Sequence, residues 1–348
     1  MEAPLFLRNA WYVLAPASEI GQALTPFRVL NEAVVIFRKT NGDPVALEDA
    51  CPHRKLPLSM GRRQDDYVVC GYHGLTFDPS GQCVACPTQS KIPPNAKVRS
   101  FPIVERYGLL WIWMGAPARA DTSKIVRIEN CDDPNWGTAA GGPMTCKCNY
   151  LYLVDNLLDP SHVSWVHLTS FAASGADKTS LQVDVKADGI VVWRWIRDCE
   201  VPPFYASVVN FTGRCDRLQH YEVRYPSVAI NRSIFTPTGT GGPDNMLHPP
   251  AFVAVSYHFL TPFDEDTTQY HWLLMRNSEP RNQEISTRMS AAARAAFEED
   301  RVVLEAVHRG IANETTPHIN LGLDAGSLRF RRELDALIKQ EGCGIATD

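Results

Sequence analysis

The 348-residue sequence has no long apolar run and no excess of positive charge. No stretch approaches the roughly 18 uninterrupted apolar residues of a membrane span, so we expect no membrane partner. A formal net charge of −5 lacks the basic footprint that nucleic-acid phosphates require, which excludes a nucleic-acid partner. The N-terminus has Glu2 and Arg8 where a secretory signal has a basic region and a continuous apolar core. We therefore expect a cytoplasmic protein.

Cysteine is well represented, with ten residues, and a reducing compartment favours thiols or metal ligands over disulfides. Two close pairs, Cys83 with Cys86 and Cys146 with Cys148, have no second half at ligand spacing. We expect these four residues to be ordinary thiols, because free cysteine commonly behaves as a small hydrophobic residue.

The first third of the chain reads as short strands. Runs such as 11–14, 34–37 and 109–114 are separated by Gly, Pro and Asn, which predicts an all-β domain over residues 1–118. The small, proline-containing stretch 115–121 is the expected linker.

The rest of the chain, residues 119–348, has a different pattern. Alternating β-type runs between 181 and 274 are followed by a proline-free, helix-forming stretch at 283–310 that stops at Gly310. The whole chain is therefore expected to have an α+β fold, with an all-β domain followed by a mixed one.

Two cysteine–histidine pairs stand out in the first domain. Cys51 and His53 form Cys-x-His, and Cys70 and His73 form Cys-x-x-His. Two thiolates and two imidazoles suit either zinc or a [2Fe–2S] cluster in which histidines replace cysteines on one iron. Zinc fingers usually place their histidines together, which this sequence does not do. The pattern favours the cluster, with the cysteines on one iron and the histidines on the other.

A second group of candidate ligands begins with His162 and His167. Residues five apart on one helix point about 140° away from each other, so a shared metal requires the helix to end or distort between them. Pro160 breaks the regular ladder ahead of His162, and Asp159 is placed like an N-cap. Taken alone, the pair is better explained as two unrelated histidines on a short helix.

A carboxylate in the predicted helix changes this interpretation. The apolar stripe of the helix consists of Ile285, Met289, Ala292, Ala293, Phe297, Leu304 and Val307. Asp300 falls on the stripe, where a carboxylate is costly unless it is paired or bound to a cation. Glu298 and Glu299 point away from the stripe and are expected to be solvated charges. Two histidines and one aspartate form the facial triad of non-haem Fe(II) oxygenases, so these three residues are the predicted ligands of a mononuclear iron.

These motifs resemble those of the Rieske non-haem iron aromatic oxygenases, in the α-only group that includes vanillate O-demethylases, dicamba monooxygenase and toluenesulfonate methyl-monooxygenase. The resemblance runs nearly end to end. It rests on CPHR at 51–54, CGYHG at 70–74, ERYGLLWIWMG at 105–115, VDNLLDPSH at 154–162 and FEEDRVVLEA at 297–306. It implies an N-terminal Rieske domain and a C-terminal helix-grip domain of antiparallel sheet and helices, assembled as a homotrimer.

The resemblance also implies roles for individual residues. In such trimers the cluster of one subunit lies beside the mononuclear iron of its neighbour, and Asp159 matches the acidic residue that bridges the two. Electrons would then pass from His73 of one subunit through Asp159 to His162 of the next. Asn156 matches a family position near the iron. Lys55 departs from the small residue that usually follows CPHR, without affecting the ligand set.

A reductase is the implied protein partner. The family draws electrons from NADH through a separate flavin and iron–sulfur reductase, and no Gly-rich dinucleotide fingerprint follows a strand in this chain. The basic residues Arg54, Lys55, Arg62 and Arg63 around the cluster loops would receive an acidic reductase. Solubilising surface charge is the alternative explanation of that group.

The implied activity is that of a terminal oxygenase that uses O2 and NADH to oxidise a methoxy group on a small aromatic acid, releasing formaldehyde. Hydroxylation of an aryl methyl group is the alternative within the same chemistry. A Rieske electron carrier without oxygenase activity is the alternative of another class, although a carrier has no need of the second ligand group. His258 is the candidate contact for the substrate's polar group, with a satisfied core histidine as its alternative role.

Overall fold

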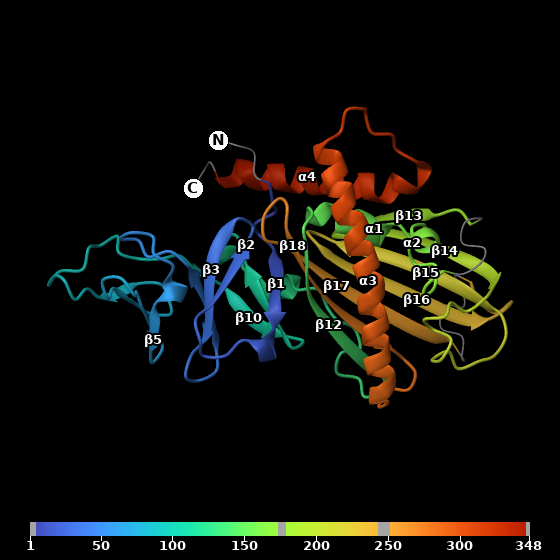
Figure 1. The fold of residues 1–348 in the computed structure, drawn as a ribbon, viewed down its shortest axis with the longest axis horizontal. Coiled ribbons are helices and arrows are strands. Elements are labelled where there is room, and N and C mark those ends of the chain that lie inside the picture. The colour runs from blue at the N-terminus through green and yellow to red at the C-terminus, as the bar shows by residue number, and fades with distance from the viewer. Residues whose placement is uncertain (1–4, 173–178, 243–250, 346–348) are drawn as a thin grey trace. The chain divides into compact units, whose positions relative to one another are not determined.

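The computed structural model describes three stretches of the chain, residues 5–172, 179–242 and 251–345. Residues 1–4, which belong to the N-terminal stretch considered above, lie outside them. The chain forms two compact units (Figure 1). The first consists of residues 1–125, 261–265 and 341–348, and the second of residues 126–260 and 266–340. The predicted division between residues 118 and 119 stays a prediction.

The first unit is built from three antiparallel sheets, as the all-β prediction requires. The first sheet contains β1 (Trp11–Pro16), β11 (Leu109–Trp113) and β10 (Ile103–Arg106). The second contains β2 (Thr25–Val29), β3 (Glu32–Arg38), β4 (Pro44–Glu48) and β9 (Ser100–Phe101). The third contains β5 (Arg62–Gln64), β6 (Tyr67–Val69), β7 (Thr76–Phe77) and β8 (Cys83–Ala85).

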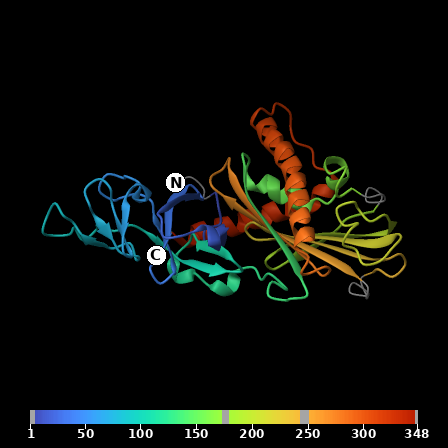
Figure 2. The ribbon, with the colours of Figure 1, turned by 60° about the horizontal axis from the view of Figure 1, so that its bottom comes forward.

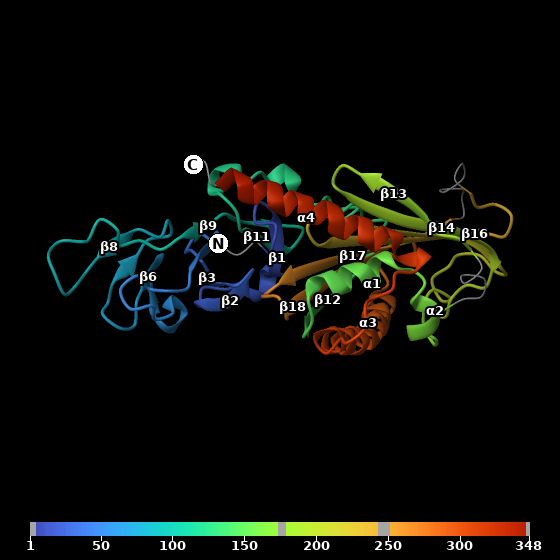
Figure 3. The same ribbon diagram turned by 90° about the horizontal axis from the view of Figure 1, so that it is seen from above.

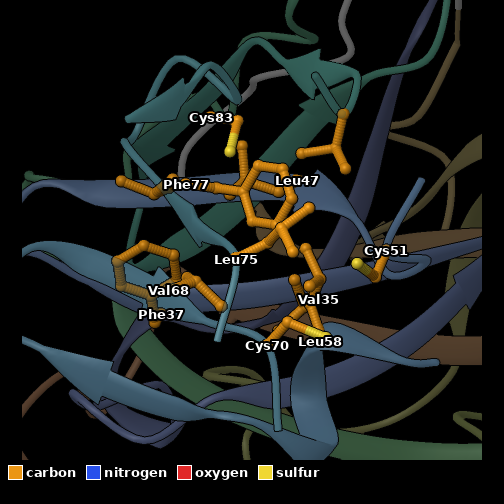
Figure 4. Packing of buried hydrophobic residues seen from close by; sticks show 12 residues of the cluster. Val35, Phe37, Leu47, Cys51, Leu58, Val68, Cys70, Leu75, Phe77 and Cys83 are labelled. Atoms are coloured by element: carbon orange, nitrogen blue, oxygen red, sulfur yellow. The ribbon is translucent and has the colours of Figure 1, made fainter. Parts of the chain in front are cut away.

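A buried apolar cluster of this unit joins the second and third sheets. Val35 and Phe37 come from β3 and Phe77 from β7, and all three are fully buried. Cys51 and Cys70 belong to the same cluster (Figure 4), so the packing that forms the core also fixes the positions of both thiols.

The second unit has one seven-stranded antiparallel sheet at its centre. In spatial order its strands are β12 (Gly137–Cys146), β18 (Thr268–Arg276), β17 (Phe252–Pro262), β16 (Val228–Pro237), β15 (Cys215–Arg224), β14 (Gly189–Cys199) and β13 (Gln182–Lys186). The alternating runs predicted between 181 and 274 are therefore strands of one sheet.

Four α-helices accompany this sheet: α1 (Tyr150–Leu158), α2 (Val163–Val166), α3 (Gln283–Ala312) and α4 (Ala325–Ile345). Helix α3 lies across one face of the sheet (Figures 1 and 2), and α1 lies on the same side (Figure 3). A long helix held against a curved antiparallel sheet is the helix-grip arrangement that the resemblance implied.

Two predictions about the helices need correction. Helix α3 continues past Gly310 to Ala312, and Val307 is 41% exposed, so the buried stripe ends one turn earlier than predicted. Helix α4 was not predicted. Its buried side chains, Phe330, Leu334 and Ile338, are spaced four residues apart, which is an ordinary helical signal.

No helix in the described part of the chain combines the length and the apolar character needed to cross a membrane.

Candidate metal centres and substrate cavity

The two cysteine–histidine loops of the first unit share one backbone design. The amide of Cys51 donates to the carbonyl of Leu56 at 2.9 Å, and the amide of Cys70 donates to the carbonyl of Leu75 at 2.8 Å. In both loops the residue four positions after the cysteine donates back to the cysteine carbonyl, at 2.8 and 3.1 Å. Each cysteine therefore begins a closed turn that projects its histidine from a fixed base.

The residue that closes each turn is in the left-handed region. It is Lys55 in the first loop, with φ of 58°, and Gly74 in the second, with φ of 72°. Glycine reaches this region without cost, whereas a side chain there costs roughly 1–2 kcal/mol. A Cβ at Gly74 would also lie 3.1 Å from Pro87 Cγ. The departure at Lys55 is thus a strained position in the first loop, where the second loop has glycine.

The four predicted cluster ligands meet as two like pairs. Cys51 and Cys70 are 1% and 2% exposed, and their thiols are close enough to interact. Burial first, and then the neighbouring Cys70 thiol, raise the pKa of Cys51. The rings of His53 and His73 lie edge to face with centroids 4.5 Å apart, and His73 Nδ1 is buried without a hydrogen-bond partner among the described residues. Paired thiols beside paired imidazoles fit a [2Fe–2S] cluster with two cysteines on one iron and two histidines on the other.

The surface around these loops carries the predicted basic group in part. Arg54, Lys55 and Arg62 are exposed. Arg63 is only partly exposed, because its Nη1 donates to the carbonyl of Arg38 at 2.7 Å. Lys55 Nζ already lies 3.7 Å from Glu48 Oε1, whereas Arg54 and Arg62 form no ion pair with the described residues and can meet a partner's acidic groups.

In the second unit the helix does end between His162 and His167, as a shared metal site requires. Helix α2 spans only Val163–Val166, with His162 at its N-cap and His167 at its C-cap. The centroids of the two imidazole rings lie 5.3 Å apart. Asp159 does not cap α2 as predicted. It ends α1, and its Oδ1 accepts the amide of Ser161 at 2.7 Å, which closes the turn between the two helices.

Asp300 completes this group from helix α3. Its side chain is 7% exposed, and its Oδ1 lies 3.1 Å from His167 Nε2 and 3.6 Å from His162 Nε2. One donor atom from each residue lies within 4.8 Å of the other two. Although the distances are short, Oδ1 makes no hydrogen bond of acceptable geometry with the described residues. Three donor atoms that converge without bonding one another fit ligands of one shared cation.

Each imidazole is oriented by a bond at its other nitrogen. His162 Nδ1 lies 2.5 Å from the carbonyl of Asp159, and His167 Nδ1 lies 2.8 Å from Glu299 Oε2. Such partners fix the tautomer and turn Nε2 toward the centre. Burial lowers the pKa of His167, but Asp300 and Glu299 outweigh it and leave that pKa above its usual value. The negative charge around the ring favours a cation at this place.

The contact made by Glu299 corrects a prediction and adds a functional residue. Glu299 was expected to be a solvated surface charge like Glu298, which pairs with Arg301. Its side chain is indeed 44% exposed, but its carboxylate reaches back to His167. The sequence signal was its position next to Asp300, since adjacent residues of one helix lie at the same level of its axis.

The remaining predicted residues are less involved. Asn156 lies on α1, and its carbonyl accepts the amide of Asp159 at 3.2 Å. Cys146 and Cys148 are fully buried, and burial raises the pKa of Cys148 to about 12. Cys83 is buried in the core of the first unit, and Cys86 packs against it.

A cavity opens beside the three converging donors. Its wall is mainly apolar and aromatic and includes Phe171, Phe204, Tyr205, Tyr221, Asn231, Ser233, Met289 and Phe297. His162, His167 and Asp300 line the same cavity. An aromatic wall with few polar groups suits a small aromatic ligand.

His258 also lines this cavity but is fully engaged. It is 1% exposed, and its ring nitrogens contact Tyr270 Oη at 2.6 Å and Ser256 Oγ at 2.8 Å. Burial lowers its pKa to about 3, so the ring is neutral. Both ring nitrogens already have protein partners, as the alternative role of a satisfied core histidine requires. A substrate contact by His258 stays a prediction.

Known proteins match both units. Residues 10–102 match the model of the Rieske [2Fe-2S] domain, and residues 146–340 match the model of the Vanillate O-demethylase oxygenase C-terminal domain. The chain is 38% identical to an iron–sulfur subunit of the toluene-4-sulfonate monooxygenase system of Comamonas testosteroni, over 98% of this chain and 100% of that subunit.

Two further relatives extend the comparison. The vanillate O-demethylase oxygenase subunit of Pseudomonas sp. (strain HR199 / DSM 7063) is 31% identical over 97% of this chain and 96% of its own. A crystal structure of dicamba monooxygenase bound to 3,6-dichlorosalicylic acid superposes with a TM-score of 0.87 at 31% identity, covering 97% of this chain and 99% of that one. The chain therefore belongs to the family of Rieske oxygenase components whose catalytic half is a vanillate O-demethylase oxygenase C-terminal domain.

Proposed function

We propose that this chain is the terminal oxygenase of a Rieske monooxygenase system and that it uses O2 to oxidise a methoxy group on a small aromatic acid. The observation that carries the proposal is the convergence of His162, His167 and Asp300 at the edge of an aromatic cavity. A redox carrier needs neither feature, and an oxygenase needs both.

Each of the two groups of donor residues suits one metal centre. Cys51, His53, Cys70 and His73 would hold the [2Fe–2S] cluster, and the two histidines with Asp300 would hold a ferrous ion. Such an ion, when bound, supplies the O2-dependent oxidation. The protein's own part is to orient both imidazoles through Asp159 and Glu299 and to hold the substrate ring in a largely dry cavity.

Electrons would come from NADH through a separate flavin and iron–sulfur reductase that docks near Arg54, Lys55 and Arg62. We infer a homotrimer in which Asp159 connects His73 of one subunit to His162 of the next. The Asp159 carbonyl already contacts His162 Nδ1, and its carboxylate remains partly exposed. Asn156, one turn earlier on α1, would lie near this path.

The reaction balances as ArOCH3 + O2 + NADH + H⁺ → ArOH + CH2O + H2O + NAD⁺. Hydroxylation of the methyl carbon gives a hemiacetal, which breaks its C–O bond to release formaldehyde and leaves the phenol. Vanillate and dicamba O-demethylases are among the relatives, so this chemistry is available to the family.

Hydroxylation of an aryl methyl group is the second candidate, and one observation favours it. The identity of 38% to the toluene-4-sulfonate monooxygenase subunit exceeds the 31% to the vanillate O-demethylase subunit. Here the product keeps its carbon as a benzylic alcohol, and no formaldehyde forms.

The experiment is turnover of 4-methoxybenzoate and toluene-4-sulfonate with a surrogate reductase, followed by formaldehyde and by the hydroxymethyl product. Formaldehyde from the methoxy acid supports O-demethylation, and benzylic alcohol alone supports the alternative. The electron-carrier alternative is tested by metal content, since an oxygenase should hold about three irons and two acid-labile sulfides per chain. Two irons per chain with no oxygenated product would reject the proposed function.

A further inference from the structure

Among the residues that the structure describes, Arg217, on strand β15, is a buried cation with almost no partner. It is 1% exposed, and its one hydrogen bond to a described residue runs from Nη1 to the carbonyl of Phe171 at 3.4 Å. Its Nε is buried and unbonded, and within the described ranges no carboxylate forms an ion pair with it. Burial of a charge is costly unless the charge is paired, so this position requires an explanation.

Two other buried arginines of the second unit make several hydrogen bonds within the protein. Arg276 is equally buried and donates to Ser286 Oγ at 3.0 Å and to the carbonyls of Glu279 and Asn282 at 2.8 and 3.2 Å. Arg194 donates to Gln219 Oε1 at 2.7 Å among other acceptors. Arg276 also has a buried Nε without a described partner, but its terminal nitrogens make three hydrogen bonds to described residues, whereas those of Arg217 make one.

The register of the sheet turns Arg217 toward the cavity. In an antiparallel pair, residues directly opposite each other point to the same face, and so do residues two or four apart. Tyr221 stands opposite Asn231, and both line the cavity. Arg217, four residues before Tyr221 and opposite Phe235, therefore lies on the same face of the sheet, next to residues that line the cavity although it does not line the cavity itself.

Two aromatic rings, one of which lines the cavity, lie against the guanidinium. Its Cζ lies 5.9 Å from the ring centroid of Tyr205 and 5.3 Å from that of Phe235. Tyr205 and Phe171, whose carbonyl takes the single hydrogen bond, both line the cavity. Ring faces compensate a buried cation in part, but they leave its N–H donors open.

The carboxylate next to it in the chain does not serve as its counter-ion. Asp216 points to the opposite face of β15, where it pairs with Arg197 at 3.1 Å and accepts the amides of Gly239 and Gly241. The anion that Arg217 lacks is therefore to be sought in the cavity.

We propose that Arg217 is the anion anchor of this cavity and binds the carboxylate or sulfonate of the aromatic substrate. The inference rests on the proposed function and names the group by which the substrate is held. The planar guanidinium matches such oxyanions with two parallel N–H···O bonds, and the aromatic wall receives the ring. Carboxylate and sulfonate share this chemistry, and the experiment separates them.

The test compares binding of acids with binding of their neutral amides. Isothermal titration of the iron-loaded enzyme with 4-methoxybenzoate and 4-methoxybenzamide, and with toluene-4-sulfonate and toluene-4-sulfonamide, gives an acid preference for each pair. We expect Arg217→Met to weaken binding of the acids by about 10- to 100-fold and to leave the amides nearly unchanged. Arg217→Lys, which keeps the charge without the fork, should fall between the two.

Arg197→Met is the matched control, because Arg197 is a half-exposed arginine of the neighbouring strand whose partner, Asp216, lies on the far face. It should keep the acid preference of the wild type. The proposal would be overturned if Arg217→Met and Arg217→Lys lost affinity for acid and amide equally, or if they kept the acid preference of the wild type. It would also be overturned if the wild type bound the amides as tightly as the acids. If the preference for acid over amide is larger in one pair, the acid of that pair carries the anion that Arg217 binds better. Because heat of binding is measured, an enzyme that discriminates acids through Arg217 but turns nothing over would refute the proposed function alone.

Discussion

Replacing Glu299 with glutamine tests the most unexpected contact of the iron site. Glu299 Oε2 lies 2.8 Å from His167 Nδ1 and holds the ring so that Nε2 faces Asp300. Glutamine keeps the size and the acceptor oxygen but removes the charge. The change therefore isolates the electrostatic part of the contact, which raises the basicity of His167 toward a metal.

The magnitude follows from the exposure of the carboxylate. Losing a partner of a metal-bound histidine typically costs 10- to 100-fold in metal affinity. Glu299 is 44% exposed, so water screens its charge, and we expect the lower end of that range. Iron should bind about tenfold more weakly in Glu299→Gln, which corresponds to about 1.4 kcal/mol.

The assay is the iron retained at the mononuclear site during titration with a chelator, with the visible spectrum of the [2Fe–2S] cluster as an internal standard. Glu298→Gln is the matched control, because Glu298 is the neighbouring glutamate on the same helix and pairs with Arg301 instead. If Glu299→Gln and Glu298→Gln retain iron equally well, the orienting role of Glu299 is wrong.

Three further predictions follow from the site and the cluster loops. Asp300→Ala should abolish turnover and leave the cluster spectrum intact; retained turnover would reject the ligand assignment. Lys55→Gly should raise the free energy of unfolding by up to about 1 kcal/mol in urea titrations, because glycine adopts a φ of 58° without strain, and a less stable variant would contradict this. Arg62→Glu should lower kcat/KM for the reductase in a salt-dependent way, and kinetics unchanged at low and high salt would exclude this docking surface. Arg63 is kept because it donates to a backbone carbonyl.

Much of the fold and the predicted ligands of both metal centres could be read from the sequence, for a physical reason. Alternation of period two and stripes of period 3.6 are local patterns, and they gave the strands of both units and helix α3. Asp300 was conspicuous because a carboxylate on an apolar stripe conflicts with its surroundings. The same reasoning applied to Phe330, Leu334 and Ile338 would have found α4.

Other features could not be read from local pattern. The role of Glu299 depends on how far a flexible side chain reaches from the rim of a helix, which periodicity does not describe. Arg217 sits in a strand with Asp216 and Gln219, where polar residues on both faces are buried, so alternation alone does not show which face meets the cavity. Both contacts depend on elements far apart in the sequence.

Helix α3 carries the predicted carboxylate ligand and the carboxylate that contacts a second predicted ligand as consecutive residues. A change in the helix that moves one of these carboxylates therefore moves the other as well. Deleting a single residue from the preceding part of α3 would turn both side chains by about 100° at once, so neither could compensate for the other. Descendants of this protein should tolerate length changes in surface loops while the stretch from Asn282 to Asp300 keeps a constant number of residues.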